Sequence, residues 1–205
     1  NINRTCIVPN GVDAFWIQNS LQVKAVQTSS ENLVGVYVGG INKNKNIESA
    51  IKGFFKVADK RKKEFIVVGG TYAEYRCHYK PLNEDIVKNV LFVGRSSKEE
   101  VLQHLARSNV FVMPSFFETF GLSYIESISQ LIPVIYSRGQ GIDGLFSDGV
   151  VGFSCDPHNI ASICDAISTA LKRFPSGISF QEENLVKDFS WSKIAEKMIN
   201  QVYFA

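Results

Sequence analysis

The fold is decided by the segment Val110-Phe-Val-Met113-Pro114-Ser-Phe-Phe-Glu118-Thr-Phe-Gly121-Leu-Ser-Tyr-Ile-Glu126. Its first four residues form an uninterrupted apolar run, which is typical of a strand buried on both faces of a parallel sheet. A Pro-Ser pair ends this run, and Phe120–Gln130 then carries apolar residues three or four positions apart. That spacing is typical of an amphipathic helix. A buried strand followed at once by such a helix is the repeating unit of an open α/β fold.

The same alternation extends in both directions along the chain. Further strands are expected at Leu33–Val38, Phe65–Val68, Val90–Val93, Pro133–Tyr136 and Val150–Phe153. Further helices are expected at Ile47–Ala58, Lys98–Arg107, Asn159–Arg173, Phe180–Asp188 and Trp191–Tyr203. The pattern predicts an α/β fold with an open parallel sheet flanked by helices.

The length of 205 residues is suited to one full domain with an appendage. Residues 1–30 show little regular pattern and are expected to be a linker or edge segment. Residues 31–175 contain the strand and helix alternation and form the expected domain. Residues 176–205 are expected to add terminal helices, whose apolar stripe is suited to packing on a further domain.

Composition excludes several classes of protein. Lys and Arg total 22 against 20 Asp and Glu, a balance that does not indicate a nucleic acid partner. No run approaches the roughly 18 apolar residues that a membrane span requires. The four cysteines contain no CxxC pair, which fits a reducing compartment and predicts a cytoplasmic protein.

The start of the 120–130 helix is the expected binding site, because open parallel sheets bind ligands beyond the carboxyl ends of their strands. The backbone N–H groups of Thr119, Phe120, Gly121 and Leu122 have no helical partners and favour an anion. Gly121 has no Cβ, which lets a phosphate approach the backbone.

Two acidic residues, Glu118 and Glu126, bracket this turn. They stand eight positions apart, and a helical rise of 1.5 Å per residue places their carboxylates on the order of 10 Å apart. That separation is too wide for the pair of a retaining glycosidase, which needs about 5 Å. It fits the two ends of a nucleotide sugar, with Glu118 on the sugar hydroxyls, Glu126 on the ribose diol and the helix start on the diphosphate.

The run from Pro114-Ser115 through Phe120-Gly121-Leu122, with its two glutamates, resembles the signature of the retaining glycosyltransferases of family 4, the group 1 glycosyltransferases. The likeness extends from Pro9-Asn10-Gly11-Val12-Asp13 to the terminal helix. The resemblance implies the C-terminal, donor-binding half of a GT-B fold, which is Rossmann-like. Residues 1–30 then belong to the interdomain region, and residues 176–205 pack toward an N-terminal domain that lies outside these 205 residues.

The resemblance also implies an activity. Such an enzyme transfers a hexose from a UDP or GDP sugar to a saccharide or lipid-linked acceptor, with retention, in polysaccharide or glycan biosynthesis. It needs no metal and no cofactor, and it works in the cytoplasm or at the cytoplasmic face of a membrane. The acceptor binds through the missing domain, so this chain alone is expected to transfer nothing.

The first loop after a strand carries the second expected catalytic residue. Gly39 and Gly40 are followed by Lys45, which the resemblance implies is cationic toward the donor diphosphate. Gly40 stands where the resemblance implies an arginine, and Lys43 is the candidate substitute. Lys45 and Glu118 are therefore the predicted catalytic residues.

Two further glycine loops complete the predicted donor site. The resemblance places Gly69 and Gly94 near the nucleotide, and Arg95 either meets the base or a phosphate or is an ordinary surface arginine. Gly144 and Leu131 depart from the pattern, because a glutamate and a glycine are usual at their places.

Two other functions remain open at this stage. The loop Arg138-Gly139-Gln140-Gly141-Ile142-Asp143-Gly144 matches G-x-G-x-x-G and invites the interpretation of an NAD-binding oxidoreductase domain. Asp148-Gly149 follows too soon for the helix that such a motif requires, which disfavours this interpretation. A non-catalytic nucleotide-sugar or phosphate-binding module is the other alternative.

Overall fold

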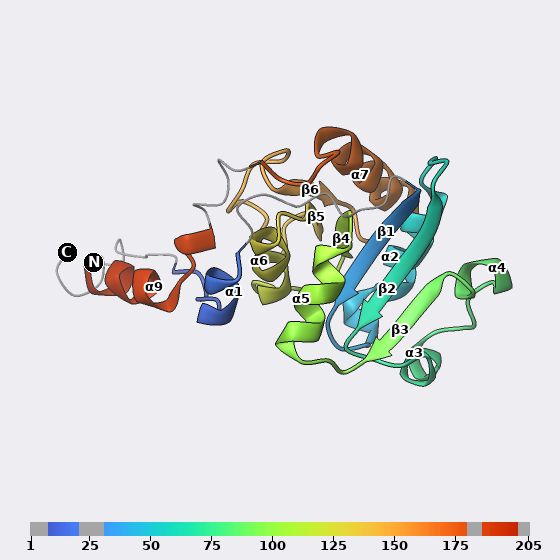
Figure 1. The fold of residues 1–205 in the computed structure, drawn as a ribbon, viewed down its shortest axis with the longest axis horizontal. Coiled ribbons are helices and arrows are strands. Elements are labelled where there is room, and N and C mark those ends of the chain that lie inside the picture. Colours follow the sequence, from blue (N-terminus) through green and yellow to red (C-terminus); the bar gives the residue numbers. More distant parts are fainter. Residues whose placement is uncertain (1–7, 21–30, 180–185, 201–205) are drawn as a thin grey trace.

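A computed structural model describes residues 8–20, 31–179 and 186–200 of the chain. It contains a six-stranded sheet in the order β3-β2-β1-β4-β5-β6, and every neighbouring pair is parallel (Figure 1). The strands are β1 (Asn32–Val38), β2 (Lys62–Val68), β3 (Val90–Gly94), β4 (Val110–Met113), β5 (Val134–Ser137) and β6 (Gly152–Cys155). The predicted open parallel sheet is confirmed.

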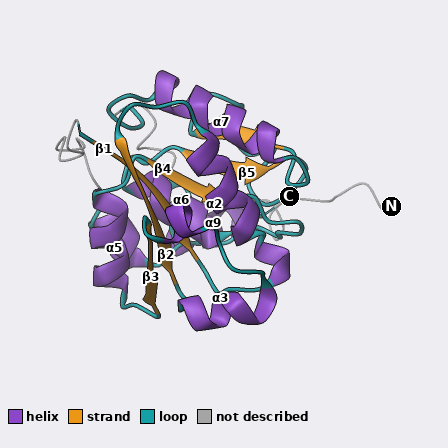
Figure 2. Ribbon diagram, turned by 90° about the vertical axis from the view of Figure 1, so that its right-hand side faces the viewer, coloured by secondary structure: helices purple, strands orange, loops and turns teal. Residues whose placement is uncertain are grey.

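Helices cover both faces of this sheet (Figure 2). They are α1 (Ala14–Gln18), α2 (Ile47–Lys56), α3 (Tyr72–His78), α4 (Glu84–Val87), α5 (Lys98–Ala106), α6 (Leu122–Ser129), α7 (Ile160–Arg173) and α9 (Trp191–Met198). On one face α2 packs against α7, and on the other α5 and α6 contact β1 and β5. Among the described residues, no helix is both long and apolar enough to cross a bilayer.

The strand order places a topological switch point between β1 and β4. The chain runs outward from β1 through β2 to β3 and then returns to lay β4 on the other side of β1. The loops that leave β1 and β4 therefore lead to helices on opposite faces of the sheet, and such a switch point is where open α/β sheets bind their ligands. Because β1 and β4 are buried, as at Val36 and Phe111, these two loops leave from the packed core.

Three helices were not indicated by the sequence pattern. The helices α3 and α4 are short, and α1 has five residues within the expected linker. Trp16 of α1 is nevertheless 2% exposed, and α1 packs against α6. Its burial ties the described part of residues 1–30 to the sheet domain. The division of the chain at residues 30 and 175 stays a prediction.

The ends of several elements differ from the expected ones. Pro133 precedes β5 because proline has no N–H to donate to the ladder. The helix α6 begins at Leu122 instead of Phe120, because Gly121 has a φ of 78°, outside the helical region. Of the expected helix over residues 180–188, residues 180–185 lie outside the described part, as do residues 201–203 of the last helix.

The apolar stripe predicted on the last helix is only partly buried. Ile194 is 3% exposed, whereas Trp191 is 60% and Met198 43% exposed. The helix lies at the end of the molecule far from β3 and α4 (Figure 1). That this stripe packs on a further domain stays a prediction.

Candidate functional site

The loop between β1 and α2 is built as a tight turn that presents Lys45. The Asn42 side chain accepts a hydrogen bond from the Lys45 N–H at 3.1 Å and begins a single 3-10 turn over Lys43–Lys45. Asn46 ends that turn with a φ of 52°, a left-handed conformation that asparagine tolerates better than most residues. Its buried side chain donates to the carbonyls of Pro114 at 3.0 Å and Pro157 at 2.8 Å. Lys45 thus projects from a turn that is fixed at both ends.

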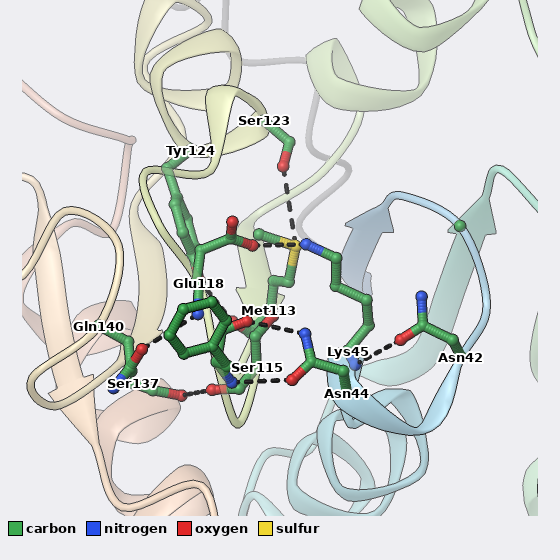
Figure 3. A network of polar contacts seen from close by, with 12 residues as sticks. Asn42, Asn44, Lys45, Met113, Ser115, Glu118, Ser123, Tyr124, Ser137 and Gln140 are labelled. Atoms are coloured by element: carbon green, nitrogen blue, oxygen red, sulfur yellow. Dashed lines mark hydrogen bonds and ion pairs between the residues drawn. The ribbon is translucent and has the colours of Figure 1, made fainter. Parts of the chain in front are cut away.

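Lys45 meets Glu118 across the switch point. The Lys45 Nζ lies 2.5 Å from the Glu118 Oε2, although 73 residues separate the two in the sequence (Figure 3). The side chains are 24% and 10% exposed, so the ion pair is mostly shielded from water. Both residues were predicted as catalytic, but the sequence did not indicate that they bond to each other.

The backbone of Glu118 is held from the opposite side by the loop after β5. Its N–H donates to the Gln140 Oε1 at 3.1 Å (Figure 3). Its carbonyl accepts from the Gly141 N–H at 2.8 Å. The glycine-rich loop, earlier considered as a dinucleotide motif, therefore supports Glu118. Residues 138–151 are all described and contain no helix, which argues against the NAD-binding interpretation.

The start of α6 lies beside Glu118, since a Cβ at Gly121 would come within 3.3 Å of that side chain. Gly121 occupies its N-cap without a side-chain cap, and within the described part of the chain no acceptor takes the backbone N–H of Thr119, Phe120 or Leu122. The structure gives a further reason for Gly121, because a Cβ there would lie 2.5 Å from the Tyr124 ring. The structure therefore has unpaired amides at the expected turn, and the helix itself begins two residues later than expected, at Leu122.

The glycines predicted to line the donor site lie against one another at the carboxyl edge of the sheet. The Gly39 N–H donates to the carbonyl of Val68 at 2.9 Å, and the Gly69 N–H donates to that of Gly94 at 2.7 Å. A Cβ at Gly69 would come within 2.4 Å of the Gly39 carbonyl oxygen. Gly40, in contrast, has open space around the position of a Cβ.

Arg95 follows this edge and faces the helix α3. It is exposed, and its charge contributes to lowering the pKa of Glu74, after the larger effect of hydrogen bonds from Thr71. The structure brings Arg95 close to α3 and does not link it to the ion pair of Lys45.

Glu126 lies in a different environment from Glu118. Burial raises its pKa to about 7, Asp13 adds to that rise, and Lys98 and a hydrogen bond from the Trp16 side chain oppose it. Asp13 is itself paired with Lys98, and that ion pair lowers the pKa of Asp13. The carboxylate of Glu126 therefore faces α1 and α5, and no partner of Glu118 is among these residues.

Sequence reasoning missed Asn46 and Gln140, which position the predicted catalytic pair, and Trp16, which contacts Glu126. A run of asparagines after a strand glycine is a local signal for a turn that contains a left-handed residue. The contacts of Gln140 and Trp16 are long-range and leave no local signal.

Comparison with known proteins shows the family to which the chain belongs. The family described as glycosyl transferases group 1 matches residues 20–177. The glycogen synthase of Mycobacterium tuberculosis is 24% identical over 205 residues, an alignment that covers 97% of this chain and 48% of that enzyme. The chain thus spans about half the length of that curated relative.

Solved structures show the same fold. Sucrose-phosphate synthase from Thermosynechococcus elongatus matches with a TM-score of 0.74 at 22% identity, over 98% of this chain and 52% of that one. Anabaena HepE, solved in complex with UDP and glucose, matches with a TM-score of 0.66 at 17% identity, over 86% of this chain and 49% of that one. The sheet is therefore the Rossmann-like half of a GT-B fold, and the chain belongs to the group 1 glycosyl transferases.

Proposed function

We propose that this chain is the donor-binding half of a retaining glycosyltransferase. The enzyme transfers a hexose from a UDP or GDP sugar to a saccharide or lipid-linked acceptor, in glycan biosynthesis. The observation that carries this proposal is the ion pair of Lys45 and Glu118 in front of the uncapped start of α6. A cation, free backbone donors and a carboxylate at one switch point suit a ligand that carries both phosphate and hydroxyl groups.

Each predicted site residue then has a place along the donor. Lys45 and the backbone N–H groups of Thr119–Leu122 bind the diphosphate, and Glu118 accepts hydrogen bonds from the sugar hydroxyls. Glu126 accepts from the ribose diol beside α5. The edge formed by Gly39, Gly40, Gly69, Gly94 and Arg95 lies along the nucleotide. The UDP and glucose bound by Anabaena HepE, which shares the fold, support a donor of this kind.

The chemical step breaks the bond between the anomeric carbon and the diphosphate oxygen. The oxygen of an acceptor hydroxyl then bonds to that carbon on the same face, and its proton is released. Negative charge grows on the departing diphosphate, where Lys45 and the amino end of α6 stabilise it. Glu118 orients the sugar through its hydroxyls and does not act as a nucleophile.

Calorimetric titration of the chain with UDP, GDP, ADP and NAD tests donor binding. A nucleoside diphosphate is expected to bind more tightly than NAD. Lys45→Ala should weaken that binding by about 10-fold to 100-fold, the value of one charge-assisted hydrogen bond. Lys56→Ala removes an exposed lysine at the end of α2 and is the matched control. Preferential binding of NAD, or no binding of any nucleoside diphosphate, would contradict the proposal.

Transfer is tested on a longer chain that supplies the acceptor side of the enzyme. NMR of the product should show the anomeric configuration of the donor, and Glu118→Ala should abolish most turnover. Glu99→Ala, an exposed acidic residue in the first turn of α5, serves as the control. An inverted product, binding without transfer, or turnover by the 205-residue chain alone would each refute the corresponding part of the proposal.

A further inference from the structure

Asn44 joins the two loops that carry the ion pair. Its Nδ2 donates to the carbonyl of Phe117 at 2.8 Å, and its Oδ1 accepts from the N–H of Phe117 at 2.9 Å. Its own carbonyl accepts from the N–H of Phe116 at 2.8 Å. The side-chain amide thus satisfies both backbone groups of one residue, as a neighbouring strand would (Figure 3).

This connection lies beyond the part of the sheet in which β1 and β4 are hydrogen-bonded to each other. The ladder between β1 and β4 pairs Gly35 with Val110 and Val36 with Phe111, several residues before the loops. Beyond it, Asn46 binds Pro114, and Asn44 binds the two residues that follow Ser115. Asn44 is therefore the contact between the loops that lies nearest in sequence to both members of the pair.

The position of the contact is significant for the ion pair. Asn44 immediately precedes Lys45, and Phe117 immediately precedes Glu118. A lysine side chain loses conformational entropy when it is held in one place. The backbones of Asn44 and Phe117 are fixed one residue away from Lys45 and Glu118. This limits the orientations that the two charged side chains sample before the donor binds, which is preorganisation.

The contact adds little to the packed interior. Phe116 is 40% exposed and Phe117 is 64% exposed, so the bonds from Asn44 do not bury these rings. A hydrogen bond of this kind contributes little to folding, because water replaces it in the unfolded chain. Loss of the Asn44 side chain should therefore leave the fold intact and mainly disturb the geometry of the loops.

We propose that Asn44 is a positioning residue, which holds Lys45 in register with Glu118 so that Lys45 receives the donor diphosphate. This inference rests on the proposed function. Asn44 touches no substrate itself and acts through Lys45, and that route separates it from a purely structural residue.

A double-mutant cycle tests the route. Affinity for UDP and GDP is measured by calorimetry in the unmodified chain, Asn44→Ala, Lys45→Ala and the double variant. Asn44→Ala is expected to weaken binding about fivefold to tenfold in the unmodified background and less than twofold when Lys45 is absent, because coupled residues are not additive. Asn83→Ala is the matched control, since Asn83 caps α4 far from the switch point and should change neither value. Thermal unfolding confirms that each variant is folded, and Asn44→Ser, whose hydroxyl is too short to reach Phe117, replaces the alanine variant if that one does not fold.

The outcomes separate the two proposals. Equal losses in both backgrounds, or no loss on Asn44→Ala, overturn the role of Asn44 and leave the donor site in place. No binding of UDP or GDP by the unmodified chain overturns the donor site and the role of Asn44 with it.

Discussion

The two ends of the candidate site are built in different ways. Around Glu118, an opposite charge at 2.5 Å satisfies the carboxylate, and bonds to the loop after β5 satisfy its backbone. Around Glu126, burial and Asp13 oppose ionisation, and the pKa rises to about 7. The first end is thus stable before any ligand arrives, whereas the second holds a carboxylate whose charge is destabilising in the free chain. We call the surroundings of Glu118 the fixed end of the site and the surroundings of Glu126 its titrating end.

The largest expected effect comes from the fixed end. Asn46→Ala should lower the free energy of unfolding by about 3 kcal/mol, because it removes two hydrogen bonds to Pro114 and Pro157 and because alanine tolerates a φ of 52° less well than asparagine. Asn46→Gly removes the same bonds but tolerates the conformation, so it should cost only about 2 kcal/mol. Denaturant unfolding measures both. Equal losses would show that the backbone conformation carries no strain, and losses below about 1 kcal/mol would show that the loops are not joined through Asn46.

At the titrating end, a substitution is expected to raise the free energy of unfolding instead of lowering it. The native pKa of Glu126, about 7, lies above its ordinary value of 4.5, so the folded chain binds more protons than the unfolded chain between those values. Stability is therefore fully present below pH 4.5 and is lost as the pH rises to 7. Glu126→Gln should abolish that loss and make the variant more stable by about 2 kcal/mol at pH 8, allowing for partial exposure.

Denaturant unfolding from pH 4 to pH 8 checks this difference. Glu99→Gln, at an exposed site on α5, should give a difference that does not change with pH. If the two ends are alike, Glu126→Gln will follow the same flat profile, and the contrast between them disappears.

The sheet could be predicted from the sequence because its strands are locally complete patterns. The run Val110–Met113 matches β4 at both ends, and the other runs overlap the observed strands. The helix α3 was missed since its signals are weak. It has seven residues, and its buried Tyr75 packs on Phe92 of β3 through a long-range contact. The helix α1 depends in the same way on Trp16 and its partners in α6.

In the candidate site, too, local sequence patterns could be predicted and long-range contacts could not. The sequence motif predicts Lys45, Glu118 and Glu126 as site residues, because each occupies a fixed place after a strand or within a helix. It did not show that Lys45 bonds to Glu118, nor that Asn44 holds their loops together. Those contacts join residues 73 positions apart, and only the closure of β1 against β4 creates them.

The smallest expected effect is a gain at the fixed end, where Lys45 and Glu118 cancel each other's charge. Gly40 lies five residues before Lys45, has a φ outside the left-handed region and has no atom within 4 Å of a Cβ. The Tyr37 hydroxyl donates to the backbone carbonyl of Gly40, so a side chain at Gly40 leaves that bond in place.

Gly40→Arg should therefore add an uncompensated cation and tighten UDP or GDP binding about fivefold, or about 1 kcal/mol. Gly40→Ala adds the Cβ without the charge and should leave the affinity unchanged. The gain should fall as salt is added and should be absent for the nucleoside without phosphates, because that ligand carries no negative charge for the added cation to attract. A gain of equal size for the nucleoside would place the added charge away from the diphosphate and would remove the distinction between the two ends.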